Sequence, residues 1–167
     1  LCLTNSATIA GSHDALAVYR RLRRENPSHH GGLLHLGETA LLSSSPEVFL
    51  RVSADGVVTT KPIKGTRPRG AGEADAALAE ELQANEKERA ENLMIVDLMR
   101  NDLGRVARLG TVSVDALLEV ETYPHVHQLV STVSAQLATG LTALDAIEAC
   151  FPAGSMTGAP KISAMRI

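Results

Sequence analysis

A short turn between two strand-like runs constrains the fold of this chain more than any other segment. Residues 48–52 and 57–61 are rich in Val, Phe, Leu and Thr, and Ser-Ala-Asp-Gly lies between them. Such runs on either side of Asp-Gly are a strong signal for a β-hairpin. A hairpin brings the ends of its two strands together. We therefore expect Glu47, at one end, to lie close to Lys64, just past the other.

Strand and helix patterns alternate along the rest of the chain. Strands are predicted at 33–36, 39–42, 111–120 and 127–137, and helices at 14–25, 73–103 and 142–150. Residues 154–167 predict a glycine-rich turn that leads into a helix. Ser12 is the expected N-cap of the first helix. Residues 73–103 have a strong helix composition that can extend over more than one helix. At its end, Arg-Asn-Asp at 100–102 predicts a structural network rather than a site.

The strand predicted at 127–137 has two different faces. Leu129, Val133, Ala135 and Leu137 point one way, and Gln128, Thr132, Ser134 and Gln136 point the other. Successive side chains of a strand lie on opposite faces. The polar face is therefore either exposed to solvent or lines a wet cavity.

Composition limits the classes of partner. The chain has 167 residues, enough for one domain, and a formal net charge of −3. That charge gives no reason to expect a nucleic acid or an anionic membrane as partner. The sequence contains no apolar run of membrane-spanning length and no signal peptide. Cys2 and Cys150 are far apart, which predicts reduced thiols and a cytoplasmic location.

The segment 61–70, Lys-Pro-Ile-Lys-Gly-Thr-Arg-Pro-Arg-Gly, is the candidate for chemistry. Lys64 lies between a proline-restricted turn and a glycine, and Arg67 and Arg69 follow. An unpaired ammonium is costly to bury, so such a segment suits an anion site and can supply an amine nucleophile. A basic surface loop is the alternative, and the segment alone leaves both interpretations open.

The order of several motifs resembles a known family. They are Ser-Pro-Glu at 45–47, Pro-Ile-Lys-Gly-Thr at 62–66, the run 85–102 with Glu-x-x-Glu, Gln-Leu-Val-Ser at 128–131, and Gly-Ser-Met-Thr-Gly-Ala-Pro-Lys at 154–161. Over nearly the whole chain they resemble the chorismate-utilising enzymes, which include anthranilate, aminodeoxychorismate, isochorismate and salicylate synthases. Lysine within Pro-Ile-Lys-Gly-Thr is similar to the aminodeoxychorismate synthase branch, because anthranilate synthases usually carry alanine there.

The resemblance implies an α/β (α+β) fold, with two antiparallel sheets packed as a sandwich and helices outside. Family members are much longer than this chain. Residues 1–167 are therefore expected to form the N-terminal and central part of a chorismate-binding catalytic domain whose C-terminal part is missing.

The resemblance also implies two catalytic residues. Lys64 corresponds to the nucleophile that attacks C2 of chorismate, and Glu47 to the general acid that protonates the departing C4 hydroxyl. Considered without the family, Lys64 would be an anion binder. Glu47 by itself would most often be a surface carboxylate.

Substrate contacts are implied for five further residues: Gly65, Thr66, Gln128, Gly154 and Ser155. Gly65 allows backbone N–H groups to approach a carboxylate, and Thr66 adds a hydroxyl donor. Gly154 and Ser155 begin a predicted helix, whose free N–H groups suit an anion.

Gln128 departs from the pattern of anthranilate synthases, which usually place a catalytic histidine directly before Leu-Val-Ser. Glutamine forms hydrogen bonds but cannot shuttle a proton at neutral pH. This weakens the anthranilate interpretation, whose second step eliminates pyruvate. His127 is expected on the opposite side of the strand, in the core or at an interface.

Glu88 and Glu91 lie three residues apart on a predicted helix, hence on one face. The family's Glu-x-x-Glu supplies ligands to Mg²⁺, an ion that prefers hard oxygen donors. The alternative is an exposed acidic face neutralised by Lys87 and Arg89. The family's second acidic pair belongs to a later segment, so this half-site is expected to hold Mg²⁺ weakly.

These residues predict an aminodeoxychorismate synthase component I. It would convert chorismate and ammonia to 4-amino-4-deoxychorismate for 4-aminobenzoate and folate synthesis, with ammonia delivered by a glutamine amidotransferase subunit or fused domain. The alternatives are anthranilate synthase component I and a non-catalytic fragment of either. We expect no turnover by the isolated chain.

Overall fold

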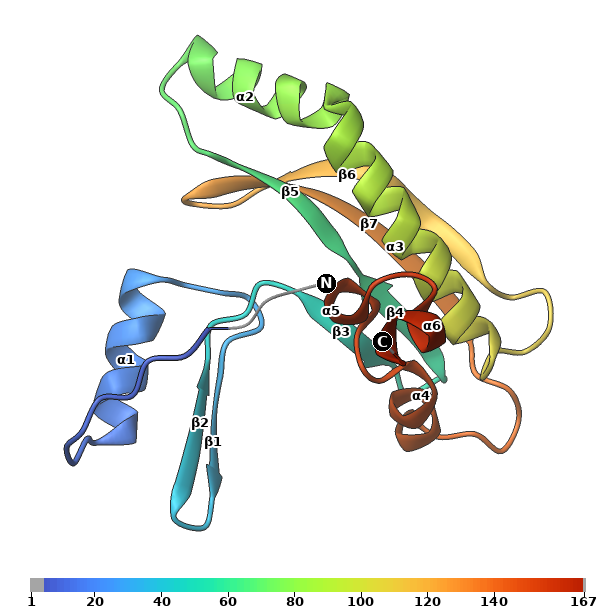
Figure 1. Cartoon of the computed structure of the whole chain (residues 1–167), viewed down its shortest axis with the longest axis horizontal. Coiled ribbons are helices and arrows are strands. Elements are labelled where there is room, and N and C mark those ends of the chain that lie inside the picture. The colour runs from blue at the N-terminus through green and yellow to red at the C-terminus, as the bar shows by residue number, and fades with distance from the viewer. Residues whose placement is uncertain (1–4, 167) are drawn as a thin grey trace. The chain divides into compact units, whose positions relative to one another are not determined.

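The computed structural model describes residues 5–166 as a mixed α/β chain with two antiparallel sheets (Figure 1). The chain divides into two compact units, one ending at Val48 and the other beginning at Phe49. The predicted fold class and the antiparallel pairing are confirmed. Each sheet belongs to a different unit, so their expected packing as a sandwich stays a prediction.

The first unit contains helix α1 (Ala15–Glu25) and the hairpin of β1 (Gly32–Leu36) with β2 (Thr39–Ser43). The expected N-cap is wrong. Asp14 caps the helix, and its carboxylate accepts hydrogen bonds from the N–H groups of Leu16 and Ala17. Ser12 lies too far ahead of the first turn to reach these groups.

The second unit is built on a five-stranded sheet with β7 at its centre. Its strands are β3 (Val48–Val52), β4 (Val57–Lys61), β5 (Ile63–Pro68), β6 (Ser113–Thr122) and β7 (Val126–Gln136). The predicted β3–β4 hairpin is confirmed. One edge of β7 pairs with β4 and then with β5, and the other edge pairs with β6. Pro62 is the single residue between β4 and β5.

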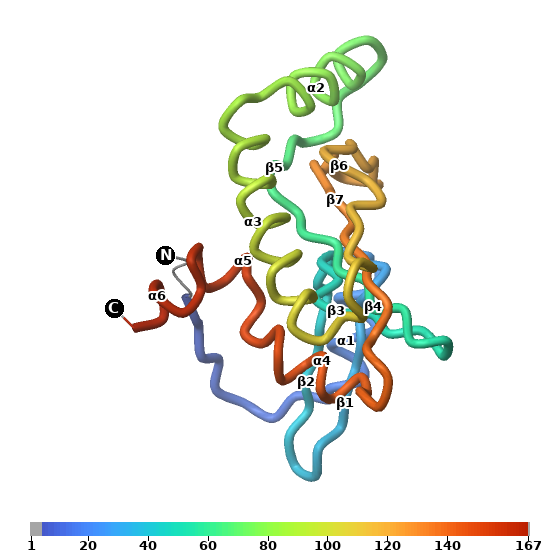
Figure 2. Tube along the Cα trace, turned by 90° about the vertical axis from the view of Figure 1, so that its right-hand side faces the viewer, coloured from blue at the N-terminus to red at the C-terminus, as the bar shows by residue number. Residues whose placement is uncertain are grey.

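The helical stretch predicted at 73–103 forms two helices. They are α2 (Glu73–Ala84) and α3 (Glu86–Gly104), and Asn85 separates them. The Asn85 side chain accepts a hydrogen bond from the Glu88 N–H and so caps α3. Both helices pack against β5 and β7, and Figures 1 and 2 show α3 running along that part of the sheet.

The core lies between these helices and one face of β7. Leu82 of α2 packs with Leu118 and Leu129, and Val96 and Leu103 of α3 belong to a larger cluster with Val58 and Val133. The predicted alternation along β7 is therefore confirmed for its apolar face. Burial of these aliphatic side chains is the main stabilising contribution, because the chain is poor in aromatic residues.

The C-terminal part forms α4 (Ala143–Cys150), α5 (Gly154–Thr157) and α6 (Lys161–Met165). Thr142 and Asp145 cap α4 reciprocally. Within the described part, residues 154–166 agree with the predicted glycine-rich turn that leads into a helix. Gly158 has a φ of +95° and ends α5 after one turn, and Pro160 precedes α6. None of the helices in residues 5–166 is both long and apolar enough to cross a bilayer.

Candidate active site

A β-bulge in β5 is the centre of the candidate site. Ile63 lies opposite Val130 and Thr66 lies opposite Gln128, so β5 has one more residue than β7 between these pairs. The bulge contains Lys64 and Gly65. Bulges change the direction of side chains and are frequent next to active sites.

Glycine is required at position 65 for two reasons. Its φ is +93°, a conformation that residues with a side chain rarely adopt. A Cβ atom at this position would lie 2.9 Å from Leu82 Cδ1 and 3.0 Å from Glu88 Cβ. The bulge is thus pressed against the junction of α2 and α3, which supports the expected role of Gly65 in a close backbone approach.

Lys64 is half-buried and precedes this contact. Lys64 belongs to the bulge and is adjacent to Gly65, the residue that approaches α2 and α3. Within residues 5–166, the Lys64 amine has no hydrogen bond or ion pair. The other three lysines of the chain each pair with a carboxylate: Lys61 with Glu121, Lys87 with Glu91 and Lys161 with Asp102. Lys64 is therefore available to a ligand.

The two arginines after Lys64 are neutralised by the protein itself. Arg67 forms two hydrogen bonds with Glu81, at 2.6 and 3.0 Å, and these raise the pKa of its guanidinium. Arg69 forms two with Asp75, at 2.8 and 2.7 Å. The segment is also a strand, so its interpretation as a basic surface loop is wrong. Lys64 is the cation that remains for an anionic ligand in this segment.

The carboxylates of Glu88 and Glu91 are on one half-buried face of α3, with side chains 19% and 40% exposed. Glu88 lies 3.5 Å from the guanidinium of Arg67, and Glu91 lies 3.7 Å from the amine of Lys87. The alternative of an exposed face is therefore wrong for Glu88, although the expected Lys87 pairing exists. Two oxygen donors one turn apart fit half of a Mg²⁺ site. The described residues contain no group of three potential ligands.

Gln128 and Thr66 share the other face of the sheet as a cross-strand pair. Gln128 is 8% exposed, and its Oε1 atom has no hydrogen-bond partner among the described residues. A buried polar atom without a partner costs free energy, which a ligand that donates a hydrogen bond would recover. His127 faces α2 instead, as predicted, with its Nε2 atom 2.8 Å from Asp75 Oδ1.

Gly154 and Ser155 belong to α5, which packs against the middle of α3. Gly154 is buried, and a Cβ atom there would lie 2.3 Å from Leu98 Cδ2. Glu88 and Leu98 are ten residues apart on α3, which corresponds to about 15 Å along the helix. The structure therefore does not bring Gly154 into contact with the bulge. Gly154 and Ser155 begin a helix, as predicted, but this helix has a single turn.

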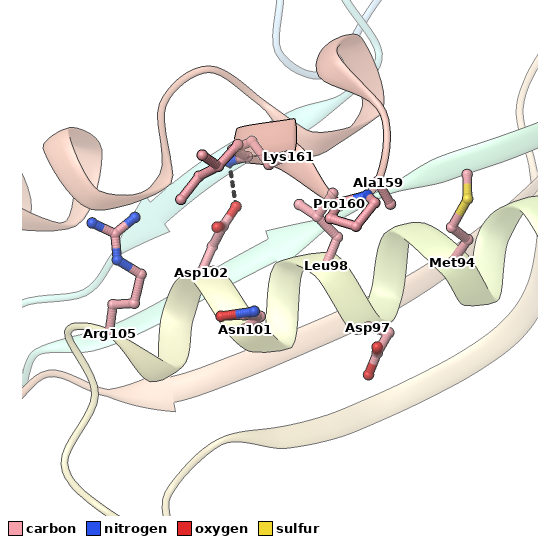
Figure 3. Close-up of a pocket in the computed structure, with 10 residues that line it drawn as sticks. Met94, Asp97, Leu98, Asn101, Asp102, Arg105, Ala159, Pro160 and Lys161 are labelled. Atoms are coloured by element: carbon pink, nitrogen blue, oxygen red, sulfur yellow. Dashed lines mark hydrogen bonds and ion pairs between the residues drawn. The ribbon is translucent and has the colours of Figure 1, made fainter. Parts of the chain in front are cut away.

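A separate pocket of about 480 Å³ lies between α3 and the segment that leads into α6 (Figure 3). It is lined by Met94, Asp97, Leu98, Asn101, Asp102, Arg105, Ala159, Pro160, Lys161 and Ile162. Asp102 and Lys161 form a buried ion pair at its side, and the amine of Lys161 also donates to the Cys150 carbonyl at 2.7 Å. The structural network predicted near the end of α3 is thus confirmed for Asp102. No predicted site residue lines this pocket.

The position of Glu47 relative to Lys64 stays a prediction. Glu47 is half-buried and directly precedes β3, and its N–H donates to Ser45 Oγ at 3.3 Å. It belongs to the first unit and Lys64 to the second. The hairpin that would bring them together is present, but their proximity stays untested.

Sequence reasoning missed two buried polar networks. In one, the Asn92 amide donates to the Leu129 carbonyl and accepts from Ser131 Oγ, which joins α3 to β7. In the other, His127 connects Asp75 with Thr122. A histidine on the apolar face of a predicted strand was the available signal, because a buried imidazole requires partners.

Comparisons with known proteins decide the family. The profile described as "chorismate binding enzyme" matches residues 1–167. The chain belongs to this family. It is 55% identical to an aminodeoxychorismate synthase from Streptomyces pristinaespiralis over 99% of its length, and 56% identical to an anthranilate synthase component 1 from Thermus thermophilus over 90%.

The solved structures agree with the family. The fold matches the crystal structure of anthranilate synthase component I from Streptococcus pneumoniae with a TM-score of 0.81, at 42% identity over 93% of this chain. The chain spans 23% of the Streptomyces protein, 33% of the Thermus protein and 34% of the Streptococcus chain. Overall identity is similar for both branches of the family, so particular residues must distinguish them.

Proposed function

We propose that the protein containing this chain is an aminodeoxychorismate synthase component I. It would convert chorismate and ammonia into 4-amino-4-deoxychorismate, a precursor of 4-aminobenzoate and folate. A relative named aminodeoxychorismate synthase matches 99% of the chain, and one named aminodeoxychorismate synthase component 1 matches 97%. The observation that carries the proposal is the half-buried amine of Lys64, which has no ion-pair partner in the described residues.

Lys64 would act as a nucleophile toward the ring of chorismate. Its neutral amine forms a bond to C2, the two conjugated ring double bonds shift, and the C4 hydroxyl leaves as water after Glu47 protonates it. Ammonia then adds at C4, the two double bonds shift back, and the amine of Lys64 leaves C2 in its original neutral form. A proton from the new ammonium group at C4 returns Glu47 to its acid form.

The bulge would hold the substrate for this step. Gly65 brings the β5 backbone close to α3, and Thr66 offers a hydroxyl next to the backbone amides. Gly154 and Ser155 are not part of this proposal, because α5 packs against Leu98, about 15 Å along α3 from Glu88. Gln128 would donate or accept a hydrogen bond through an amide that is otherwise unpaired.

Gln128 also favours this reaction over anthranilate formation. Anthranilate synthesis needs a further proton transfer to eliminate pyruvate, and an amide cannot transfer a proton at neutral pH. Anthranilate synthase component I is the second candidate, because relatives with that name match the chain equally well.

Mg²⁺ is proposed as the cofactor, with Glu88 and Glu91 as two of its ligands. Both side chains carry hard oxygen donors and lie on one face of α3, which supports their assignment as Mg²⁺ ligands. The ion would neutralise a carboxylate of the substrate. We further propose a cytoplasmic protein that receives ammonia from a glutamine amidotransferase subunit or fused domain.

The test is product analysis of the full-length protein with chorismate, ammonium and Mg²⁺. We expect aminodeoxychorismate, which an added lyase converts to 4-aminobenzoate. Lys64→Ala should abolish this product, and Lys64→Arg, which keeps the charge but is a poor nucleophile, should not restore it. Anthranilate with pyruvate, or a Lys64→Ala variant of full rate, would contradict the proposal. The isolated chain is expected to show no turnover.

A further inference from the structure

A polar cluster outside the proposed reaction centre joins three parts of the second unit. His127 in β7 is 2% exposed. Its Nε2 atom lies 2.8 Å from Asp75 Oδ1 in α2, and its Nδ1 atom lies 2.9 Å from Thr122 Oγ1 at the end of β6. Both ring nitrogens of this buried imidazole therefore have a partner.

The neighbours of His127 define its hydrogen bonds. Asp75 accepts two hydrogen bonds from Arg69 and one from the Gly70 N–H at 2.8 Å. The bonds from Arg69 are the main reason that the pKa of Asp75 lies well below its usual value, so Asp75 is a carboxylate that only accepts. Nε2 of His127 must then carry a proton and donate it. In the neutral ring, Nδ1 accepts from the Thr122 hydroxyl.

The cluster lies next to the bulge in the β5–β7 pairing. His127 is directly opposite Arg67, one position from the Thr66–Gln128 pair. The Arg69 N–H donates to the His125 carbonyl at 3.1 Å, which continues the pairing past β5. On the other side of the bulge, Ser131 N donates to the Pro62 carbonyl at 3.2 Å. These flanking contacts set the register on either side of the bulge.

We propose that His127 is a positioning residue that fixes this register and thereby the positions of Lys64 and Gln128. Its hydrogen bond to Asp75 ties β7 to the start of α2, and its hydrogen bond to Thr122 ties β7 to β6. Loss of these bonds allows the N-terminal half of β7 to shift relative to β5. A shift of one residue would move every side chain of that segment to the other face.

The catalytic part of this inference rests on the proposed function, whereas the structural part does not. A displacement of about 1 Å at a reacting group can lower a rate about a hundredfold. The expected effect of losing the His127 bonds is therefore on kcat for chorismate, by about tenfold to a hundredfold. Lys64 itself would remain intact.

Three substitutions in the full-length protein separate positioning from general stability. His127→Gln places an amide nitrogen near the position of Nε2 and keeps the bond to Asp75. His127→Asn is too short to reach Asp75, and His127→Ala loses both bonds. Val133→Ala is the matched control, because Val133 is a fully buried β7 residue in the half that pairs with β4.

The expected result is a lower kcat for the Asn and Ala variants, substantial rescue by Gln, and an unchanged kcat for the folded Val133→Ala control. Amide hydrogen exchange should accelerate at residues 66, 67 and 126–130 in the Asn and Ala variants only. Equal kcat and equal exchange for the Gln and Ala variants would overturn the inference. If the wild type does not consume chorismate, the proposed function fails, and the exchange pattern still decides the role of His127.

Discussion

Replacing Gly65 by alanine tests the bulge on which the candidate site depends. The backbone at this residue has a φ of +93°, and placing an L-residue in such a left-handed conformation costs about 1–2 kcal/mol. The added Cβ atom would also lie 2.9 Å from Leu82 Cδ1 and 3.0 Å from Glu88 Cβ. The end of the leucine side chain can move, but Glu88 Cβ is fixed to the helix backbone. Overpacking of this kind costs about 1–3 kcal/mol.

The total expected loss is about 2–5 kcal/mol in the free energy of unfolding, as the sum of the two costs. Gly140→Ala is the matched control. Gly140 has a φ of +86°, but its Cβ would meet nothing within 4 Å. The control should therefore lose only the conformational part, about 1–2 kcal/mol.

Urea unfolding of the full-length variants would measure the difference in unfolding free energy between Gly65→Ala and Gly140→Ala. Limited trypsin digestion would show whether the β5–α3 region takes part in that unfolding. We expect Gly65→Ala to be less stable than Gly140→Ala by about 1–3 kcal/mol, because only Gly65 is confined by neighbouring atoms. Equal losses for the two variants would show that the approach of β5 to α3 does not restrict this residue. The reasoning about the bulge would then be refuted.

Three further predictions concern the rest of the second unit. Lys161→Met should destabilise the protein by about 3–5 kcal/mol because it leaves Asp102 buried without its partner, and adding Asp102→Asn should recover part of this in urea unfolding. Burial raises the pKa of the Cys150 thiol to about 11, so iodoacetamide at pH 8 should label it only after denaturation, and rapid native labelling, seen by peptide mass, would contradict this. Replacing Glu88 and Glu91 by glutamine should weaken Mg²⁺ binding in isothermal titration, whereas an unchanged Kd would exclude them as ligands.

Local sequence predicted those elements whose signals lie within a few residues. The β3–β4 hairpin forms where Asp55-Gly56 predicted it. The alternation in residues 127–137 correctly placed His127 and Gln128 on opposite faces of the strand. Both follow from the short period of strands and turns. The same reasoning failed at Ser12, because Asp14 is an equally good cap and lies closer to the first turn.

The candidate site was predictable only in part, for a physical reason. Sequence motifs identified Lys64 and Gly65, but not the one-residue bulge that surrounds them. Whether a basic side chain is free depends on carboxylates that approach from elsewhere in the chain. Arg67 turned out to be paired with Glu81, 14 residues away, and Lys64 was left without such a partner among residues 5–166.

The sequence by itself determined the family, the antiparallel strands and the residues available for chemistry, since these depend on local pattern and on motif order. Tertiary structure alone decided which polar groups meet. His127 and Asp75 are 52 residues apart, and Lys161 and Asp102 are 59 apart. No periodicity encodes such pairs. They form because leaving a buried charge or hydrogen-bonding group without a partner costs free energy, and packing determines which partner is within reach.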